Sequence, residues 1–185
     1  MLALKKGTHI DLNKFYSLMQ ADFDERELLS QLEIHKGMLK GEMELYIAYD
    51  DETKITLAYA LLMTKNVYGY ALLKYFAVLP WYRDSGIGVD AMRLLLKLFA
   101  DKQGMICEIP VFEDNDEEQI KKLTKFFNRF GFEEMETSYK IGGAPAKLYV
   151  KPLRNTADIT PVHKRIMLDF YSRCLPVNSE MIKFE

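Results

Sequence analysis

Apolar residues follow two patterns in the middle of the chain, one typical of strands and one typical of helices. Residues 72–78, LLKYFAV, form a nearly continuous apolar run that predicts a buried strand. Pro80 ends this strand, because proline has no N–H to donate to a neighbouring strand. After a polar loop, four apolar residues at helical spacing predict a helix with one apolar face: Met92, Leu95, Leu96 and Phe99.

The segments before this strand predict an antiparallel sheet. Residues 43–50 alternate between apolar and mixed positions, and residues 55–64 are almost all apolar, as in a strand covered on both faces. Polar turns at 50–53 and 65–69 connect each strand to the next. The three strands therefore form a meander that ends in the central strand.

The N-terminal part of the chain predicts one strand and two helices. Residues 2–5 form a short strand, and Asp11 is placed as the N-cap of a helix over residues 12–19. A second helix is expected over about residues 24–38. Its apolar side carries Leu28, Leu29, Leu32 and Ile34.

The segments after the central helix predict the other half of the sheet. Residues 105–112 form a strand that runs parallel to 72–79, because a helix crosses over between the two. A helix over 117–130 follows, and residues 133–140 and 147–153 form a hairpin.

Residues 154–185 read as a C-terminal extension of a domain that spans residues 1–153. Pro161 starts a helix that runs to about Leu175. An isolated helix of this length is marginal in water, so its apolar stripe needs a partner. That partner is either the body of the same chain or a second copy of it in a homodimer.

Composition excludes several classes of protein. A net charge of −2 argues against a nucleic-acid binder, which needs a basic face. No apolar run approaches a membrane span, and the N-terminus lacks the apolar core of a signal peptide. The two cysteines, Cys107 and Cys174, and the three histidines have no spacing typical of metal ligands. We expect a cytoplasmic protein with no metal and with no nucleic-acid or membrane partner.

The loop RDSGIG at residues 83–88 has the composition of an anion site. It joins a strand to a helix N-terminus, where backbone N–H groups lack partners and the helix dipole is positive. Gly86 and Gly88 allow the backbone to approach a phosphate closely, and Arg83 can add a charge-assisted contact. Taken alone, these residues also suit an ordinary turn with a solvated arginine.

Residues 76–88, FAVLPWYRDSGIG, resemble the acyl-CoA signature of the GNAT superfamily of N-acetyltransferases. In that signature an apolar strand and a proline precede [QR]-x-x-G-x-[GA], and Arg83, Gly86 and Gly88 match its three defined positions. The resemblance implies that backbone near Val78 pairs with the pantetheine arm of coenzyme A. It also implies that the loop amides hold the pyrophosphate, and these belong to Asp84, Ser85, Gly86, Ile87 and Gly88.

The resemblance covers about residues 43–153 and implies a fold. This is an α/β fold of the α+β type, with a mixed, mostly antiparallel sheet of six to seven strands flanked by helices. The sheet splays between its two parallel central strands, and the C-terminal helix is extra. Asn115 matches an asparagine of the family that often bonds the pantetheine, although it lies farther than usual from the next motif. Phe127 stands where the family has a tyrosine whose hydroxyl lies near the coenzyme thiol.

The residues that move protons are harder to identify. Glu108 is the leading candidate for a general base, and its alternatives are a solvated edge-strand carboxylate or an ordered water that relays the proton. Leu72, Lys74 and Phe76 are expected to share one face of the central strand, and neither Leu72 nor Lys74 is a natural base. Phe127 has no proton to donate, and the tyrosines that could replace its role are Tyr139, Tyr149 and Tyr171.

The resemblance implies a transferase that uses acetyl-CoA. The expected reaction is direct attack by a primary amine, carried by a small molecule or a protein, on the thioester. The alternative is a non-catalytic acyl-CoA-binding or interaction module on the same fold, which Phe127 and the missing base suggest.

Overall fold

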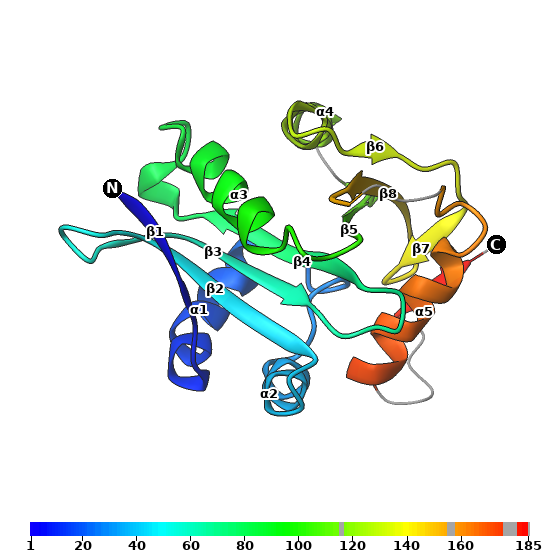
Figure 1. Ribbon diagram of the computed structural model, residues 1–185, viewed down its shortest axis with the longest axis horizontal. Helices are drawn as coiled ribbons and strands as arrows, with labels where there is room; N and C mark the ends of the chain where they lie inside the picture. The colour runs from blue at the N-terminus through cyan, green and yellow to red at the C-terminus, as the bar shows by residue number, and fades with distance from the viewer. Residues whose placement is uncertain (115–116, 155–157, 176–180, 185) are drawn as a thin grey trace.

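A mixed β-sheet runs through the centre of the computed structural model, which describes residues 1–114, 117–154, 158–175 and 181–184 (Figure 1). Within these residues the strand order is β1-β2-β3-β4-β5-β8-β7-β9, and β6 pairs with β8. The strands are β1 (Leu2–Lys6), β2 (Met43–Asp50), β3 (Thr56–Met63), β4 (Tyr70–Val78), β5 (Gly104–Pro110), β6 (Glu133–Glu134), β7 (Tyr139–Ile141), β8 (Ala144–Pro152) and β9 (Ile182–Phe184).

Helices cover both faces of the sheet. In Figure 1, α3 and α4 lie above the sheet, and α1, α2 and α5 lie below it. The helices are α1 (His9–Asp22), α2 (Gln31–Leu39), α3 (Ile87–Leu98), α4 (Glu117–Arg129) and α5 (His163–Cys174), with a short 3₁₀ turn at Pro80–Tyr82. This arrangement confirms the predicted fold class, including the mostly antiparallel sheet and its one parallel pair.

The parallel strands β4 and β5 pair over four residues only. Their register begins at Tyr70 beside Gly104 and ends at Leu73 beside Cys107. Beyond this point β5 still pairs with β8, as far as Pro110 beside Ala146. The N–H of Val111 donates to Pro145, so the nitrogen of Pro110 faces the side that β4 has left. A proline in this strand therefore costs no ladder hydrogen bond.

A β-bulge in β4 occurs at the same level. Leu73 lies opposite Leu62 and Tyr75 lies opposite Leu61, so Lys74 is the extra residue. The extra residue reverses the alternation of faces. The expectation that Leu72, Lys74 and Phe76 share one face is therefore wrong. Leu72 belongs to the core below the sheet, and Phe76 packs against the core above it.

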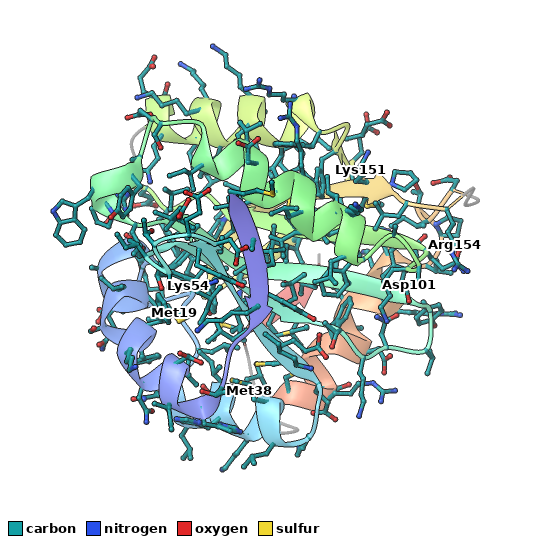
Figure 2. All side chains as sticks on the ribbon, turned by 60° about the vertical axis from the view of Figure 1, so that its left-hand side comes forward. Met19, Met38, Lys54, Asp101, Lys151 and Arg154 are labelled. Atoms are coloured by element: carbon teal, nitrogen blue, oxygen red, sulfur yellow. The ribbon has the colours of Figure 1, made fainter. Side chains whose placement is uncertain are left out.

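The core that lies between the sheet and helices α1, α2 and α5 is the largest. It contains Leu12 and Met19 of α1 and Ile34 of α2, each with no exposed surface. Figure 2 labels Met19 and Met38, which come from these two helices and face this core. Leu32 was expected on the buried side but is 62% exposed.

The N-terminal helices begin at residues other than those expected. Thr8 is the N-cap of α1, and Asp11 accepts the N–H of Thr8 at 2.9 Å in a capping box. Ser30 and Glu33 form the same motif at α2. The predicted helix over 24–38 is therefore wrong in its first part, because a capping box starts a new helix at residue 31.

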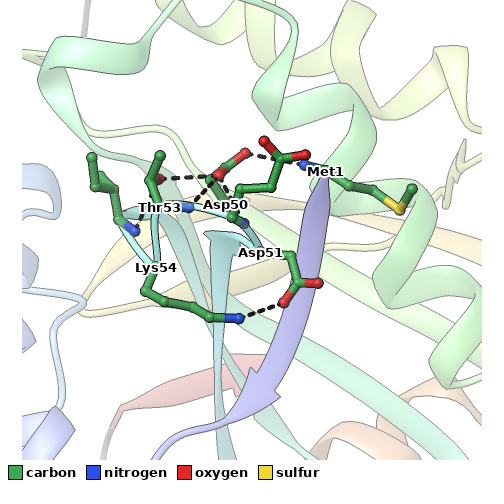
Figure 3. Close-up of polar contacts among 7 residues, drawn as sticks. Met1, Asp50, Asp51, Thr53 and Lys54 are labelled. Carbon is green, nitrogen blue, oxygen red and sulfur yellow. Dashed lines mark hydrogen bonds and ion pairs between the residues drawn. The ribbon is translucent and has the colours of Figure 1, made fainter.

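The turn between β2 and β3 is closed by a single carboxylate (Figure 3). Asp50 accepts the N–H of Thr53 at 2.8 Å, and the amino group of Met1 lies 3.2 Å from its other oxygen. These contacts, the Thr53 hydrogen bond above all, lower the pKa of Asp50 to about 2. Lys54, at φ 59°, completes the turn and pairs with Asp51.

Two elements near the C-terminus differ from expectation. The predicted strand 133–140 is divided into β6 and β7, and the Thr137 hydroxyl between them hydrogen-bonds the ring of His163 at 2.8 Å. This contact draws the chain toward α5. β9, which pairs with β7, was not expected. With β6 and β7 counted separately and β9 added, the described sheet has nine strands rather than six or seven.

The helix of the C-terminal extension packs on the body of its own chain. Six of its twelve residues are buried, and all but one of these belong to the large core below the sheet: His163, Ile166, Met167, Phe170, Tyr171 and Cys174. Its apolar stripe therefore needs no second subunit. The boundary at residue 153 between domain and extension stays a prediction.

We predict that Phe170→Ala lowers the free energy of unfolding by about 3–5 kcal/mol, because the fully buried ring would leave a cavity. Leu168→Ala is the control, since Leu168 is on the same helix and half exposed. Its expected cost is within about 0.5 kcal/mol. Urea denaturation measures both. Equal costs would contradict the docking of α5.

Candidate active site

A cleft of about 900 Å³ lies where β4 and β5 separate. One wall is formed by β4 from Leu73 to Val78 and by the loop that follows it, and the other by β5 and α4. Residues 21–24 and Glu27, from the end of α1 and the connection to α2, line it as well. The cleft thus brings together segments that are far apart in the sequence.

The loop between β4 and α3 presents unpaired backbone donors to this cleft. Within the described residues, the N–H groups of residues 84–88 make no hydrogen bond. Asp84 at φ 60° and Gly86 at φ 87° both adopt the left-handed conformation, which turns consecutive amides toward one side. A Cβ at Gly88 would lie 3.2 Å from the Val78 side chain, so glycine lets α3 begin close to β4. The geometry suits a bound phosphate.

Arg83 is held within the loop by two contacts. Its Nε donates to the carbonyl oxygen of Val78 at 3.1 Å, and its Nη2 donates to Asp22 at 2.5 Å. Asp22 also accepts the Tyr59 hydroxyl at 2.8 Å. The arginine therefore ties the end of β4 to the end of α1. The roles of Val78, Arg83 and residues 84–88 toward coenzyme A stay predictions.

A buried polar cluster lies at the closed end of the split. Lys74 Nζ donates to Glu108 Oε1 at 2.6 Å, and the two side chains are 0% and 1% exposed. The hydroxyl of Tyr139 donates to Glu108 Oε2 at 2.8 Å, and that of Tyr171 donates to Oε1. Burial raises the pKa of both tyrosines well above the ordinary value. Both carboxylate oxygens of Glu108 are therefore occupied by donors that keep their protons.

Glu27 is another acid that lines the cleft, and the sequence reasoning did not identify it. It lies on the connection between α1 and α2 and is half-buried. Burial raises the pKa of Glu27 to about 7, Lys74 opposes this shift, and Glu108 adds to it. Glu27 lies 81 residues from Glu108 along the chain, so no local pattern could have linked the two.

Phe127 lines the cleft and is also packed in the core above the sheet. Its ring is in edge contact with Phe126 and Phe132, at centroid distances of 5.5 and 5.4 Å, and it is 7% exposed. Tyr149 stacks beside it, but the Tyr149 hydroxyl donates to Glu134 at 2.8 Å. Of the three candidate tyrosines, none lines the cleft. The position of Phe127 relative to the thiol stays a prediction.

Asn115, which was expected to bond the pantetheine, lies outside the described residues. Cys107 lines the cleft as a free thiol, and burial raises its pKa well above the ordinary value, so it stays protonated at neutral pH. Within the described residues, no group of three or more His, Cys, Asp or Glu side chains is placed to hold a metal.

The site is thus a split sheet with an amide-lined loop at its edge. In a comparison with known families, residues 12–132 match the acetyltransferase (GNAT) family. The match covers well over half of the chain. This protein belongs to the GNAT acetyltransferase family. It is therefore an enzyme of the class that transfers acetyl groups from acetyl-CoA to amines. Membership favours catalysis over the alternative of a non-catalytic module.

Solved structures of GNAT enzymes share the fold. Spermidine N-acetyltransferase from Vibrio cholerae, in complex with CoA and spermine, is 14% identical, with a TM-score of 0.64 over 82% of this chain and 95% of that one. The ribosomal-protein-S18-alanine N-acetyltransferase from Escherichia coli is 16% identical, with a TM-score of 0.59 over 85% and 97%. No curated protein sequence matches this GNAT chain significantly.

Among the described helices, none combines the length and the apolar composition that crossing a bilayer requires.

We predict that Lys74→Met and Glu108→Gln each lower the free energy of unfolding by about 3–5 kcal/mol, because each leaves a buried charge unpaired. The double variant should cost several kcal/mol less than the sum. Urea denaturation of all four proteins measures this coupling.

The exposed pair Lys54 and Asp51 is the control, and its coupling should be far smaller, because solvent screens the two charges. Costs at Lys74 and Glu108 that add to within about 0.5 kcal/mol would contradict the buried ion pair.

Proposed function

We propose that this protein transfers the acetyl group of acetyl-CoA directly to a primary amine that reaches the cleft beside Glu27. The observation that carries the proposal is the position of the unpaired amides of residues 84–88 at one end of the cleft where β4 and β5 separate. An anion held by those amides places its attached chain along the free edge of β4. The thioester then lies between the two separated strands.

The coenzyme side of the cleft is assigned to the loop after β4. Residues Asp84 to Gly88 hold the pyrophosphate, and the backbone of β4 near Val78 pairs with the pantetheine arm. β4 from Lys74 onward has no strand beside it on the β5 side, which leaves this edge available to the arm, although the Val78 carbonyl already accepts a hydrogen bond from Arg83. Arg83 adds positive charge beside this path, although part of that charge is paired with Asp22.

The acceptor side is assigned to the wall formed by residues 21–27. The two neighbours described above act on a polyamine and on the alanine of a ribosomal protein, and both kinds of acceptor present a primary amine. Spermidine, spermine and a peptide with a free N-terminal alanine are therefore the first acceptors to test. Acetyl-CoA consumption, with mass spectrometry of the product, identifies the acceptor. Saturable binding of acetyl-CoA with no transfer to any amine would favour a binding module.

Direct attack is favoured over a covalent enzyme intermediate. The thiol that lines the cleft is Cys107, and its raised pKa keeps it a poor nucleophile. Backbone N–H groups of β4 polarise the thioester oxygen. The role of Glu108 as general base stays a prediction.

A cytoplasmic location, and the absence of nucleic-acid and membrane partners, are proposed from composition and the net charge of −2. A homodimer is a further proposal, which the buried stripe of α5 does not require.

We predict that Gly86→Asp weakens coenzyme A binding more than tenfold, which is about 1.4 kcal/mol. The new carboxylate would repel the pyrophosphate at the helix N-terminus. Gly143→Asp is a matched control, because Gly143 also has a positive φ and open space around it but lies in the turn between β7 and β8. Titration calorimetry should show unchanged affinity in the control. Unchanged affinity in folded Gly86→Asp protein would refute the placement.

We predict that Phe127→Tyr leaves coenzyme A affinity nearly unchanged and raises the transfer rate, unless another acid already protonates the thiolate. A positioned acid contributes roughly 10²–10⁴-fold. Phe130→Tyr, on the turn that follows α4 and outside the cleft, should leave the rate unchanged. Destabilisation of Phe127→Tyr by a kilocalorie or more in urea would place the ring in the core and away from the thiol.

A further inference from the structure

We propose that Glu27 is the catalytic base of this enzyme and takes the proton from the acceptor amine. The inference rests on the proposed function and adds a residue to it. It starts from a geometric observation, namely that the connection between α1 and α2 spans the split between β4 and β5 and carries Glu27 into the cleft.

The connection is fixed to β4 by one buried tyrosine. The Tyr75 hydroxyl donates to the carbonyl oxygen of Glu27 at 2.8 Å and accepts the N–H of Leu29 at 2.8 Å. Phe23 packs against the Tyr75 ring with centroids 4.8 Å apart. The backbone of Glu27 therefore has a defined position against β4, on the side of the sheet that α1 and α2 cover.

The same connection is fixed to the other side of the split by Arg26. Its guanidinium donates to Asp114 at 2.8 Å and lies 3.9 Å from the centroid of the Phe112 ring, just beyond β5. The carbonyl of Arg26 lies against Gly142, where a Cβ would come within 2.1 Å of its oxygen. Glu27 thus lies on a connection that is held on both sides of the split, by Tyr75 of β4 and by the contacts of Arg26.

The surroundings of Glu27 suit a base that works near neutral pH. Burial raises its pKa to about 7 and the charge of Glu108 adds to the rise, while Lys74 and a hydrogen bond with the backbone of Asp24 oppose it. A base with a pKa near the working pH is charged often enough to act and basic enough to take a proton. The two charges of the buried Lys74–Glu108 pair act on Glu27 in opposite directions, so burial is the main cause of the raised pKa.

Glu108 is less suited to the same role. Its oxygens already accept hydrogen bonds from Lys74, Tyr139 and Tyr171, and its side chain is 1% exposed. Protonating it would separate a buried ion pair. Glu27 lines the cleft, and the hydrogen bond that bears on the pKa of its carboxylate comes from the backbone of Asp24 rather than from a charged partner.

The proton and electron balance of the step is complete. One proton of the substrate ammonium passes to the Glu27 carboxylate, and the neutral amine forms a bond to the thioester carbonyl carbon. The C–S bond breaks, and its electron pair leaves on sulfur. The second proton leaves the nitrogen and reaches the thiolate through water. Glu27 then releases its proton to solvent.

The test compares pH profiles of kcat/KM with acetyl-CoA and the panel amine that reacts fastest. The wild-type profile should fall on the acid side with a midpoint near pH 7. Glu27→Gln should lose the midpoint near pH 7, because its rate then follows the free amine, and should be slower by roughly 10²–10⁴-fold at pH 7. Its deficit should shrink toward pH 10, where the free amine becomes abundant, since an ordinary aliphatic amine has a pKa near 10.4. Coenzyme A affinity should not change.

Glu25→Gln is the matched control, because Glu25 is exposed on the same connection and does not line this cleft. Its profile should match wild type. Glu108→Gln is compared at a temperature where it is folded, and it should keep the acid limb with a shifted midpoint. An acid limb with its midpoint near pH 7 that persists in Glu27→Gln would overturn the proposal.

A second readout does not need an acceptor. Titration of ¹³C-labelled glutamate carboxyls by NMR, assigned with Glu27→Gln, should give a midpoint near 7 for Glu27. A midpoint below about 5.5 would overturn the proposal even if transfer occurs. If calorimetry detects no coenzyme A binding, the proposed function fails, and the NMR midpoint still reports on Glu27 separately.

Discussion

The ion pair between Lys74 and Glu108 lies at the level where β4 and β5 cease to pair, and much of the structure is arranged around it. Two charges without exposed surface need full hydrogen bonding, or their desolvation would destabilise the fold. The protein meets this need with donors from β7 and α5, and with a bulge that directs Lys74 toward β5. The split that admits a ligand is thus stabilised by a polar cluster at its closed end.

Divergence of the two strands also explains the placement of the proline and of the connection between α1 and α2. Strand edges without partners expose N–H and C=O groups, which a sheet normally pairs. Pro110 removes one donor from the β5 edge. The connection covers part of the split and is held by Tyr75 on one side and by Arg26 on the other. What remains open is the cleft.

The segment to which the coenzyme is assigned could be located from sequence because it is local. The strand, proline, loop and helix N-terminus lie within residues 72–99, and periodicity together with two glycines defines them. The fold class followed from the family resemblance that this segment carries, and the strand runs and helix stripes agree with it. The acceptor side could not be predicted in this way. Glu27 falls in a segment whose leucine spacing favoured a helix over 24–38, whereas the Ser30 capping box starts α2 later. The bulge at Lys74 depends on pairing with β3, which no local pattern encodes.

Tyr171 has a consequence for the order in which the molecule is assembled. It comes from the last described helix, yet it donates to a carboxylate in the middle of the sheet. A nascent chain that has emerged as far as residue 153 already contains the whole coenzyme loop, both members of the ion pair and Tyr139. It still lacks the Tyr171 hydroxyl, so one donor to Glu108 is missing. Completion of the buried cluster around Glu108 is therefore among the last events of synthesis, and a chain released early would carry a buried carboxylate with one donor fewer.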